Sequence, residues 1–189
     1  MNVSRRFLLS ARLCGALLCL ALSLMLAPVS LAGRYEENTL KAAMVLNIAR
    51  FTEWPTDDGI GATGTLRLCV FDTEGGMLGA FRELLPKRIH RRELVVRPVR
   101  RSTDLDACEL LFVRDPDRSS VSRLLAAVER RAVLSVGDMP GFAEAGGIIN
   151  LVRAGRKLRF EVNLGEARAA GLKISSRLLK LATIVGEPR

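Results

Sequence analysis

Three polar side chains near the end of the chain have types and spacing that suit binding chemistry. Arg159, Glu161 and Asn163 lie two positions apart in the segment KLRFEVNL, so they project from one face if that segment is a strand. A guanidinium, a carboxylate and a carboxamide on one face can line a groove for a small polar ligand. A solvated strand face, common in antiparallel pairs, looks the same in sequence. Both interpretations stay open.

Asp138 is the carboxylate best placed to act in catalysis. It precedes Met139–Gly141, where a strand is expected to end, and a hydrolase could use it there. Aspartate at such a position commonly caps a turn or a short helix, so we interpret Asp138 as a cap. The sequence has no dinucleotide fingerprint, phosphate loop, HExxH, calcium loop or GxSxG motif. It therefore predicts no catalytic residue, no metal site and no cofactor, and a protein that is not an enzyme.

The two central cysteines form a second candidate site. Cys14 and Cys19 belong to the N-terminal segment discussed next, which leaves Cys69 and Cys108. In an oxidising compartment two cysteines have only each other as intramolecular partners, which favours a Cys69–Cys108 disulfide. A redox-responsive pair is the alternative.

Residues 1–32 predict export. They combine three arginines and no acidic residue with an apolar core and the ending Ser30-Leu31-Ala32, as in a signal peptide cleaved near Ala32. The apolar run is broken before it reaches the length of about 20 residues that a membrane-spanning helix needs. We expect the mature chain, residues 33–189, to be periplasmic.

The amino-acid composition argues against a disordered chain and against nucleic-acid binding. The 189 residues carry a net charge of +9, and 49% are hydrophobic, which excludes an intrinsically disordered chain. Aromatic residues make up only 5%, which argues against a base-stacking nucleic-acid surface. In the periplasm, positive charge meets lipid head groups and acidic protein surfaces, so we expect no nucleic-acid partner.

Alternating elements predict a single α/β domain with a mostly parallel central sheet flanked by helices. An amphipathic helix is expected over residues 35–51, with its apolar stripe at Leu40, Ala43, Met44, Ile48 and Phe51. Four strands should follow, over 65–71, 93–99, 108–113 and 132–136, with helices over 75–85 and 119–131. A flavodoxin-like order would make the first and third strands neighbours and bring the two cysteines together.

The C-terminal part should differ from this alternation. Residues 148–152 and 157–164 read as a β-hairpin, since Gly and Arg residues separate two apolar runs. Two helical pieces are expected after it, over 165–170 and 174–185.

Five segments together resemble the YfiR family of exported bacterial proteins: LKAAMVLNIARFTEWP, LRLCVF, CELLFV, VLSVGDMPGFAEAGGIINLV and KLRFEVNLGEARAAGLKISSRLLKLATIV. The resemblance runs from Leu40 to about Val185 and implies a compact α/β domain that can form a homodimer. It also implies a periplasmic repressor that binds the periplasmic sensor domain of an inner-membrane diguanylate cyclase. An OmpA-like outer-membrane lipoprotein would relieve the repression by sequestering the repressor. The consequence would be lower cyclic di-GMP and less biofilm.

The resemblance extends to particular residues. Cys69 and Cys108 match the family's strand cysteines, which form a stabilising disulfide, whereas a second family pair has no counterpart within residues 145–152. A candidate ligand or partner surface is carried over to polar residues of the hairpin and the end of the chain, namely Arg159, Glu161, Asn163, Lys173 and Ser175. A periplasmic protein that binds or senses a small solute is the alternative function.

Overall fold

A computed structural model describes residues 29–55, 64–84, 88–155 and 157–186. The chain divides into two units, Met1–Arg34 and Tyr35–Arg189, and the sheet and both cores belong to the second unit. The expected signal peptide, residues 1–32, lies outside the described residues except for its last four positions. None of the described helices has the length and apolar character that a bilayer-spanning segment needs.

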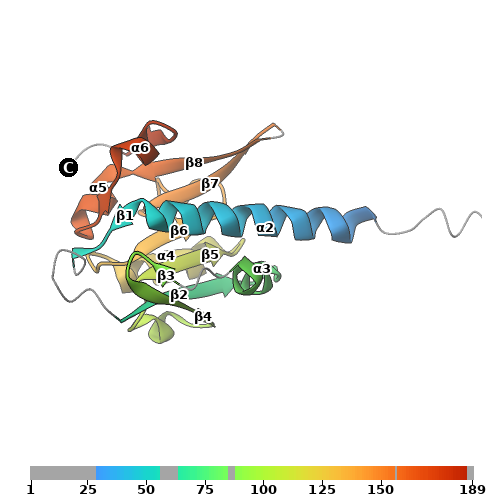
Figure 1. Cartoon of the computed structure of the whole chain (residues 1–189), viewed down its shortest axis with the longest axis horizontal. Coiled ribbons are helices and arrows are strands. Elements are labelled where there is room, and N and C mark those ends of the chain that lie inside the picture. The colour runs from blue at the N-terminus through green and yellow to red at the C-terminus, as the bar shows by residue number, and fades with distance from the viewer. Residues whose placement is uncertain (1–28, 56–63, 85–87, 156, 187–189) are drawn as a thin grey trace, which may run out of the picture. The chain divides into compact units, whose positions relative to one another are not determined.

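The central sheet has eight strands among the described residues, and Figure 1 shows them as one continuous layer. From one edge to the other they are β10 (Thr183–Val185), β8 (Lys157–Asn163), β7 (Ile149–Ala154), β6 (Leu134–Gly137), β5 (Leu110–Arg114), β2 (Thr65–Asp72), β4 (Arg92–Pro98) and β3 (Arg88–Ile89). Neighbouring strands are parallel except in the β7–β8 hairpin and the β3–β4 pair. The predicted α/β fold with a mostly parallel sheet is confirmed.

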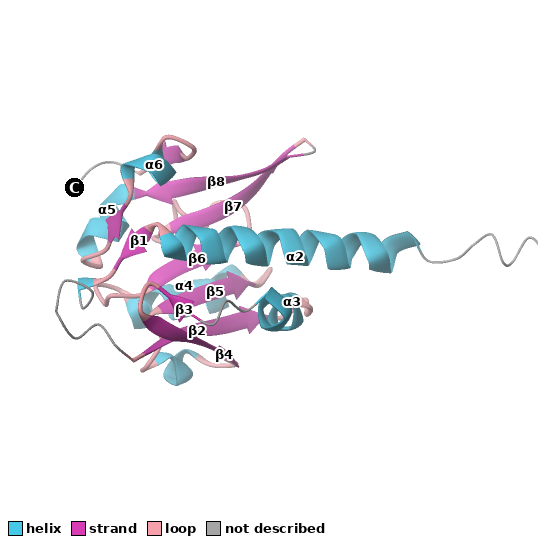
Figure 2. Ribbon diagram, in the orientation of Figure 1, coloured by secondary structure: helices cyan, strands magenta, loops and turns pink. Residues whose placement is uncertain are grey.

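Helices cover both faces of the sheet (Figure 2). On one face α2 (Val29–Arg50), from Tyr35 onward, and α3 (Met77–Leu84) pack on the larger apolar core, which includes Phe81 and Phe112. On the other face α4 (Arg118–Val128) and the 3₁₀ helix η2 (Ser102–Leu105) pack on a second core. The near-continuous apolar sequence of β5 follows from this double coverage, because every residue of that strand is buried.

Helix α2 forms where the sequence predicts a helix, but it buries a different face. The buried apolar side chains are Ala42, Val45, Leu46, Ile48 and Ala49. Within the predicted stripe only Ile48 is buried, whereas Leu40 is 55% exposed and Phe51, just after the helix, is 42% exposed. Apolar residues surround this helix on most sides, so periodicity alone could not choose between two overlapping stripes.

The chain ends differently from the prediction. Helices α5 (Leu164–Ala169) and α6 (Ser176–Leu179) form, and α6 stops six residues before the predicted end at Val185. The β-branched run Thr183-Ile184-Val185 instead becomes β10, which pairs in parallel with β8. A short second sheet joins β1 (Thr52–Glu53) to β9 (Lys173–Ile174).

The predicted strand order and disulfide are both confirmed. Strand β2 lies between β4 and β5, and the Cys69–Cys108 disulfide joins β2 to the residue two positions before β5, with a Cα–Cα distance of 5.9 Å. The Arg97 guanidinium lies against both sulfurs, with Nε 3.3 Å from Cys69 Sγ and Nη2 3.4 Å from Cys108 Sγ. The bond is buried beneath this side chain on the α4 side of the sheet.

Candidate functional site

Charged side chains gather where three parallel strands end. Asp72 closes β2, Arg114 closes β5, and Asp138 follows β6 directly. The chain leaves β2 for β4 on one side and returns to β5 on the other, so the direction of winding reverses between β2 and β5. Open α/β sheets bind ligands outside the carboxyl ends of their strands at such a point. This edge is therefore the first place to look for a site.

Arg114 fills the crevice between β2 and β5. Its Nε and Nη2 donate to the two carboxylate oxygens of Asp72 at 2.8 and 3.1 Å. Its Nη1 donates to Asn38 Oδ1 of α2 at 2.9 Å, and its Nη2 also donates to the carbonyl of Gly75. Asp72 accepts a further bond from the backbone N–H of Met77, where α3 begins. The guanidinium thus links strands β2 and β5 to helix α2 and, through Asp72, to helix α3.

A second ionic group lies beside the first. Lys41 Nζ donates to Asp138 Oδ2 and to Glu37 Oε1, at 2.7 Å in each case. The other Glu37 oxygen lies 2.6 Å from Arg153 Nη2 on β7. Hydrogen bonds from Lys41 and then Arg153 lower the pKa of Glu37 from 4.5 to about 2. Asp138, interpreted from the sequence as a cap, is instead an ion-pair partner of a helix lysine.

A cavity of about 510 Å³ opens beside this ionic group. Its polar lining comes from α2, the loop after β6, and the hairpin, through Glu37, Lys41, Asp138, Asn150, Arg153 and Glu161. Asn150 is fully buried on β7, and its Nδ2 donates to Glu161 Oε2 on β8 at 2.9 Å. Its Oδ1 is buried and accepts no hydrogen bond from the described residues. The hairpin thus contributes the half-buried Glu161 carboxylate to the cavity.

The loop that bounds this cavity is held by one aromatic ring. Phe142 is fully buried and lies against two glycines, Gly137 at the end of β6 and Gly147 before β7. A Cβ at either glycine would come within 2.1 Å of the ring. This contact explains why glycine precedes and follows the segment DMPGFAEAG.

The predicted row on β8 is not a uniform surface. Arg159 is exposed, Glu161 is half-buried and lines the cavity, and Asn163 is buried. Asn163 Oδ1 accepts from the backbone N–H of Glu166 at the start of α5, and its Nδ2 donates to the carbonyl of Ala143 at 2.9 Å. Asn163 therefore caps a helix and anchors a loop, and Glu161 is the row's member at the cavity.

Lys173 and Ser175 lie in another part of the fold. Lys173 is exposed on β9, in the two-stranded sheet with β1. Ser175 caps α6 by accepting from the backbone N–H of Arg177, and its own N–H donates to the carbonyl of Phe51. Neither residue lines the cavity that Glu161 lines.

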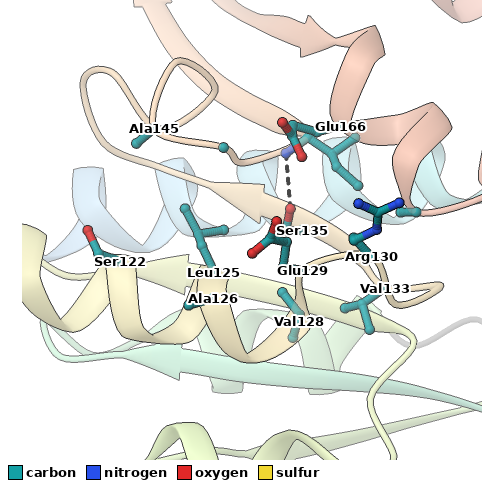
Figure 3. A pocket seen from close by; sticks show the side chains of 13 residues that line it. Ser122, Leu125, Ala126, Val128, Glu129, Arg130, Val133, Ser135, Ala145 and Glu166 are labelled. Atoms are coloured by element: carbon teal, nitrogen blue, oxygen red, sulfur yellow. Dashed lines mark hydrogen bonds between the residues drawn. The ribbon is translucent and has the colours of Figure 1, made fainter. Parts of the chain in front are cut away.

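A smaller hollow of about 280 Å³ lies between α4, the loop before β7, and α5 (Figure 3). The Ser135 hydroxyl at its floor accepts from the backbone N–H of Ile148 at 3.0 Å, as the dashed line in Figure 3 marks. Glu129, Arg130 and Glu166 stand around it. Because the Ser135 hydroxyl already accepts a hydrogen bond from the backbone, this hollow has fewer polar groups that could bind a ligand than the cavity beside Lys41.

Sequence reasoning missed the residues that organise the main site. Asn38, Lys41, Arg114 and Asn150 are all buried, and all but Asn38 interrupt or end an otherwise apolar run. A polar residue within a buried run is the signal that could have found them, because burial is costly unless such groups are paired. The described part of the chain has no group of three or more His, Cys, Asp or Glu side chains arranged to hold a metal ion.

Two solved structures are similar to parts of this chain. A conserved domain protein from Vibrio cholerae O1 biovar El Tor str. N16961 is 14% identical with a TM-score of 0.51, over 79% of this chain and 60% of that one. The ABC domain of a Streptococcus protein, solved in complex with L-Trp, is 9% identical with a TM-score of 0.46, over 64% and 55%. The chain thus spans about 60% of the first structure and 55% of the second.

At these identities the first likeness concerns the fold alone. No curated protein matches the sequence. A family model described as YfiR/HmsC-like matches residues 38–183, which include nearly the whole sheet, both cores and the lining of the cavity except Glu37. The chain therefore belongs to the YfiR/HmsC-like family.

Proposed function

We propose that this protein represses an inner-membrane diguanylate cyclase by binding the cyclase's periplasmic sensor domain. Repression would lower cellular cyclic di-GMP and biofilm formation. Residues 1–32 would direct export and be removed, and an OmpA-like outer-membrane lipoprotein would relieve repression by sequestering the protein. The observation that carries the proposal is the family match over residues 38–183.

The ionic site supports a binding role. Arg114, Lys41 and Asp138 are each engaged with other side chains of the same chain. A catalytic carboxylate or nucleophile needs access to substrate and a partner to move its proton, whereas these groups neutralise one another. They stabilise the edge of the sheet, and they hold α2 against it from Tyr35 onward. The outer surface of α2 is therefore fixed in position relative to the sheet.

The exposed apolar row of α2 supplies a surface for a protein partner. Leu40, Met44 and Phe51 follow one another at helical spacing; Leu40 and Phe51 are 55% and 42% exposed, and Met44 is half-buried against the larger core. All three belong to the stripe that the sequence predicts as core, of which only Ile48 is buried. Contiguous apolar side chains on a surface are typical of protein interaction sites. We assign this row, Leu40–Met44–Phe51, to the contact with the sensor domain.

Affinity capture tests the assignment. Residues 33–189 are immobilised and incubated with detergent-solubilised envelopes from the native host, and bound proteins are identified by mass spectrometry. The wild-type chain should retain a diguanylate cyclase with a periplasmic domain, and Phe51→Asp should retain much less. Val95→Asp is the matched control, because Val95 is equally exposed, at 42%, but lies on β4.

Two outcomes would contradict the proposal. Retention of no cyclase by the wild-type chain would remove the partner. Equal retention by Phe51→Asp and Val95→Asp would remove the α2 row as the contact. Sedimentation of the same variants distinguishes a third assignment, in which Phe51→Asp abolishes a homodimer and leaves cyclase capture intact.

A further inference from the structure

We propose that a hollow on the α4 side of the sheet binds a phosphate group, which is held by the guanidinium groups of Arg100, Arg101 and Arg123. The hollow lies between η2 and the first two turns of α4, and its volume is about 250 Å³. This proposal is independent of the proposed repression of a cyclase and uses none of the residues assigned to that contact. It rests on the charge of the lining, on the hydroxyl groups beside it and on its place in the fold.

The lining of the hollow carries three positive charges and no negative one. Arg100 and Arg101 belong to the loop after β4, and Arg123 belongs to α4. All three are exposed, and among the residues that the structure describes none lies within salt-bridge distance of a carboxylate. The rest of the lining is hydroxyl-bearing or apolar: Phe71, Ser102, Thr103, Ser120 and Leu124. An anion would therefore meet guanidinium groups whose charge no direct ion pair neutralises.

Two acidic residues are close in sequence to the lining, Asp104 and Asp117, but neither lines the hollow. Asp117 accepts from the backbone N–H and the hydroxyl of both Ser119 and Ser120, and so caps α4. Asp104 accepts from the backbone N–H of Arg101 at 3.2 Å. Both carboxylates thus have donors of their own, and the arginine side chains remain directed to other partners.

Arg123 is held in place by hydroxyl groups. Its Nη2 donates to Ser120 Oγ at 2.9 Å, and its Nη1 donates to Ser119 Oγ at 3.5 Å. The Ser120 hydroxyl in turn donates to Asp117 Oδ2 at 2.7 Å. A guanidinium has five N–H donors, so those of Arg123 that the two serines leave unused are available to a ligand. A planar fork of donors with a fixed orientation suits the paired oxygens of an oxyanion.

The position of the hollow in the fold also favours a ligand. Arg100 and Arg101 follow the carboxyl end of β4, and Phe71 lies one residue before the carboxyl end of β2. Open α/β sheets bind ligands outside the carboxyl ends of their strands. Between β2 and β5 that place is taken by the Arg114–Asp72 salt bridge. The hollow beside β4 and β2 is at the same edge and is open.

The chemistry and size of the lining select a phosphate group. Guanidinium groups bind pairs of phosphate oxygens, and the hydroxyls of Ser102 and Thr103 can donate to others. The volume of about 250 Å³ is below the roughly 300–1,000 Å³ of pockets that enclose a whole small molecule. The hollow therefore fits a phosphate group with a short polar attachment. Such a group occurs on a soluble phosphate monoester and in the head group of an anionic phospholipid.

Two probes of the mature chain, residues 33–189, distinguish these sources. Titration with glycerol 1-phosphate, followed by NMR at the arginine Nε–Hε signals, tests a soluble phosphate, and a saturable shift of the Arg123 signal counts as binding. Sedimentation with vesicles of phosphatidylglycerol and phosphatidylcholine, compared with phosphatidylcholine alone, tests a phospholipid. Binding of the vesicles alone would identify the phospholipid as the source. Binding of glycerol 1-phosphate, with or without the vesicles, would show that the phosphate group itself is recognised.

Arg123→Gln should weaken binding of either probe roughly tenfold or more, because charge-assisted hydrogen bonds are lost. Arg159→Gln is the matched control, since it removes the same charge from an exposed position on β8 and should leave binding unchanged. Arg100→Gln changes a loop residue instead of a helix residue, and should weaken binding in the same direction.

The proposal is overturned if neither probe binds. It is also overturned if Arg123→Gln and Arg159→Gln weaken binding equally, because that result would show attraction to the net charge of the protein instead of a site. Circular dichroism of each variant confirms that it is folded before binding is compared. None of these results bears on capture of a cyclase.

Discussion

Arg114 and Asp72 form a two-point salt bridge, at 2.8 and 3.1 Å, that joins the carboxyl ends of β5 and β2. In open α/β folds this position, where the winding reverses, commonly receives a ligand. Here the protein's own guanidinium occupies it. The free space lies instead toward β7 and β8, where Asn150 and Glu161 line the cavity.

Removing the Arg114 guanidinium should destabilise the fold. Arg114→Met leaves the Asp72 carboxylate buried without its cation, and breaking a buried pair in this way costs about 3–5 kcal/mol. Urea unfolding at pH 7 measures the change. Arg159→Met, at an exposed position, should cost less than about 0.5 kcal/mol. Equal stability of the two variants would show that the salt bridge does not stabilise the sheet edge.

The contact between Phe142 and Gly137 predicts a non-additive pair of substitutions. Gly137→Ala places a Cβ 2.1 Å from the ring, so overpacking should cost about 1–3 kcal/mol or more. In the background of Phe142→Ala the same change should cost little, because the ring is gone. Gly79→Ala in α3, where nothing lies within 4 Å, should be neutral or stabilising. Additive costs in the double variant would argue against the contact.

The Cys69–Cys108 disulfide should contribute about 4 kcal/mol to the stability of the oxidised protein, for a sequence separation of 39 residues. Cys69→Ser should lower the melting temperature of the oxidised protein, and reductant should lower that of the wild type by a similar amount. Calorimetry with and without reductant measures both. A wild-type protein that melts at the same temperature in reductant would contradict the prediction, provided mass spectrometry shows that the bond was reduced.

Acid should weaken the contacts of Glu37. Its pKa is about 2 in the folded protein and 4.5 ordinarily, so its contribution to stability is fully present above pH 4.5 and is lost as the pH falls toward 2. The difference in unfolding free energy between wild type and Glu37→Gln should therefore shrink as the pH falls from 5 to 2. Urea unfolding across this range measures that difference. A constant difference would show that the folded pKa of Glu37 is not lowered.

Periodicity and apolar runs predicted most of the fold because they report burial. The apolar run CELLFV predicted the strand over residues 108–113, and a flavodoxin-like order predicted that the first and third strands, β2 and β5, are neighbours. The face of α2 could not be chosen, because the buried Lys41 pairs not only with Glu37 but also with Asp138, almost a hundred residues away. A tertiary ion pair of this kind leaves no periodic trace in the sequence.

The candidate site was harder to predict. Glu161 was identified from its spacing on the strand, but its partner Asn150 sits on the opposite arm of the hairpin and depends on register. Asn163 looked equivalent to Glu161 by spacing, yet the chain turns into α5 directly after it, which converts its side chain into a cap. Helix α6 is short because residues 183–185 pair with β8 as a strand instead of continuing the helix.

Cellular cyclic di-GMP in a strain that lacks the gene tests the central claim of repression most directly. Mass spectrometry should show a higher level than in the parent strain, and expression of the wild-type protein with its export segment should restore the parental level. Expression of Phe51→Asp should restore it less than Val95→Asp does. An unchanged level of cyclic di-GMP in the deletion strain would contradict the account.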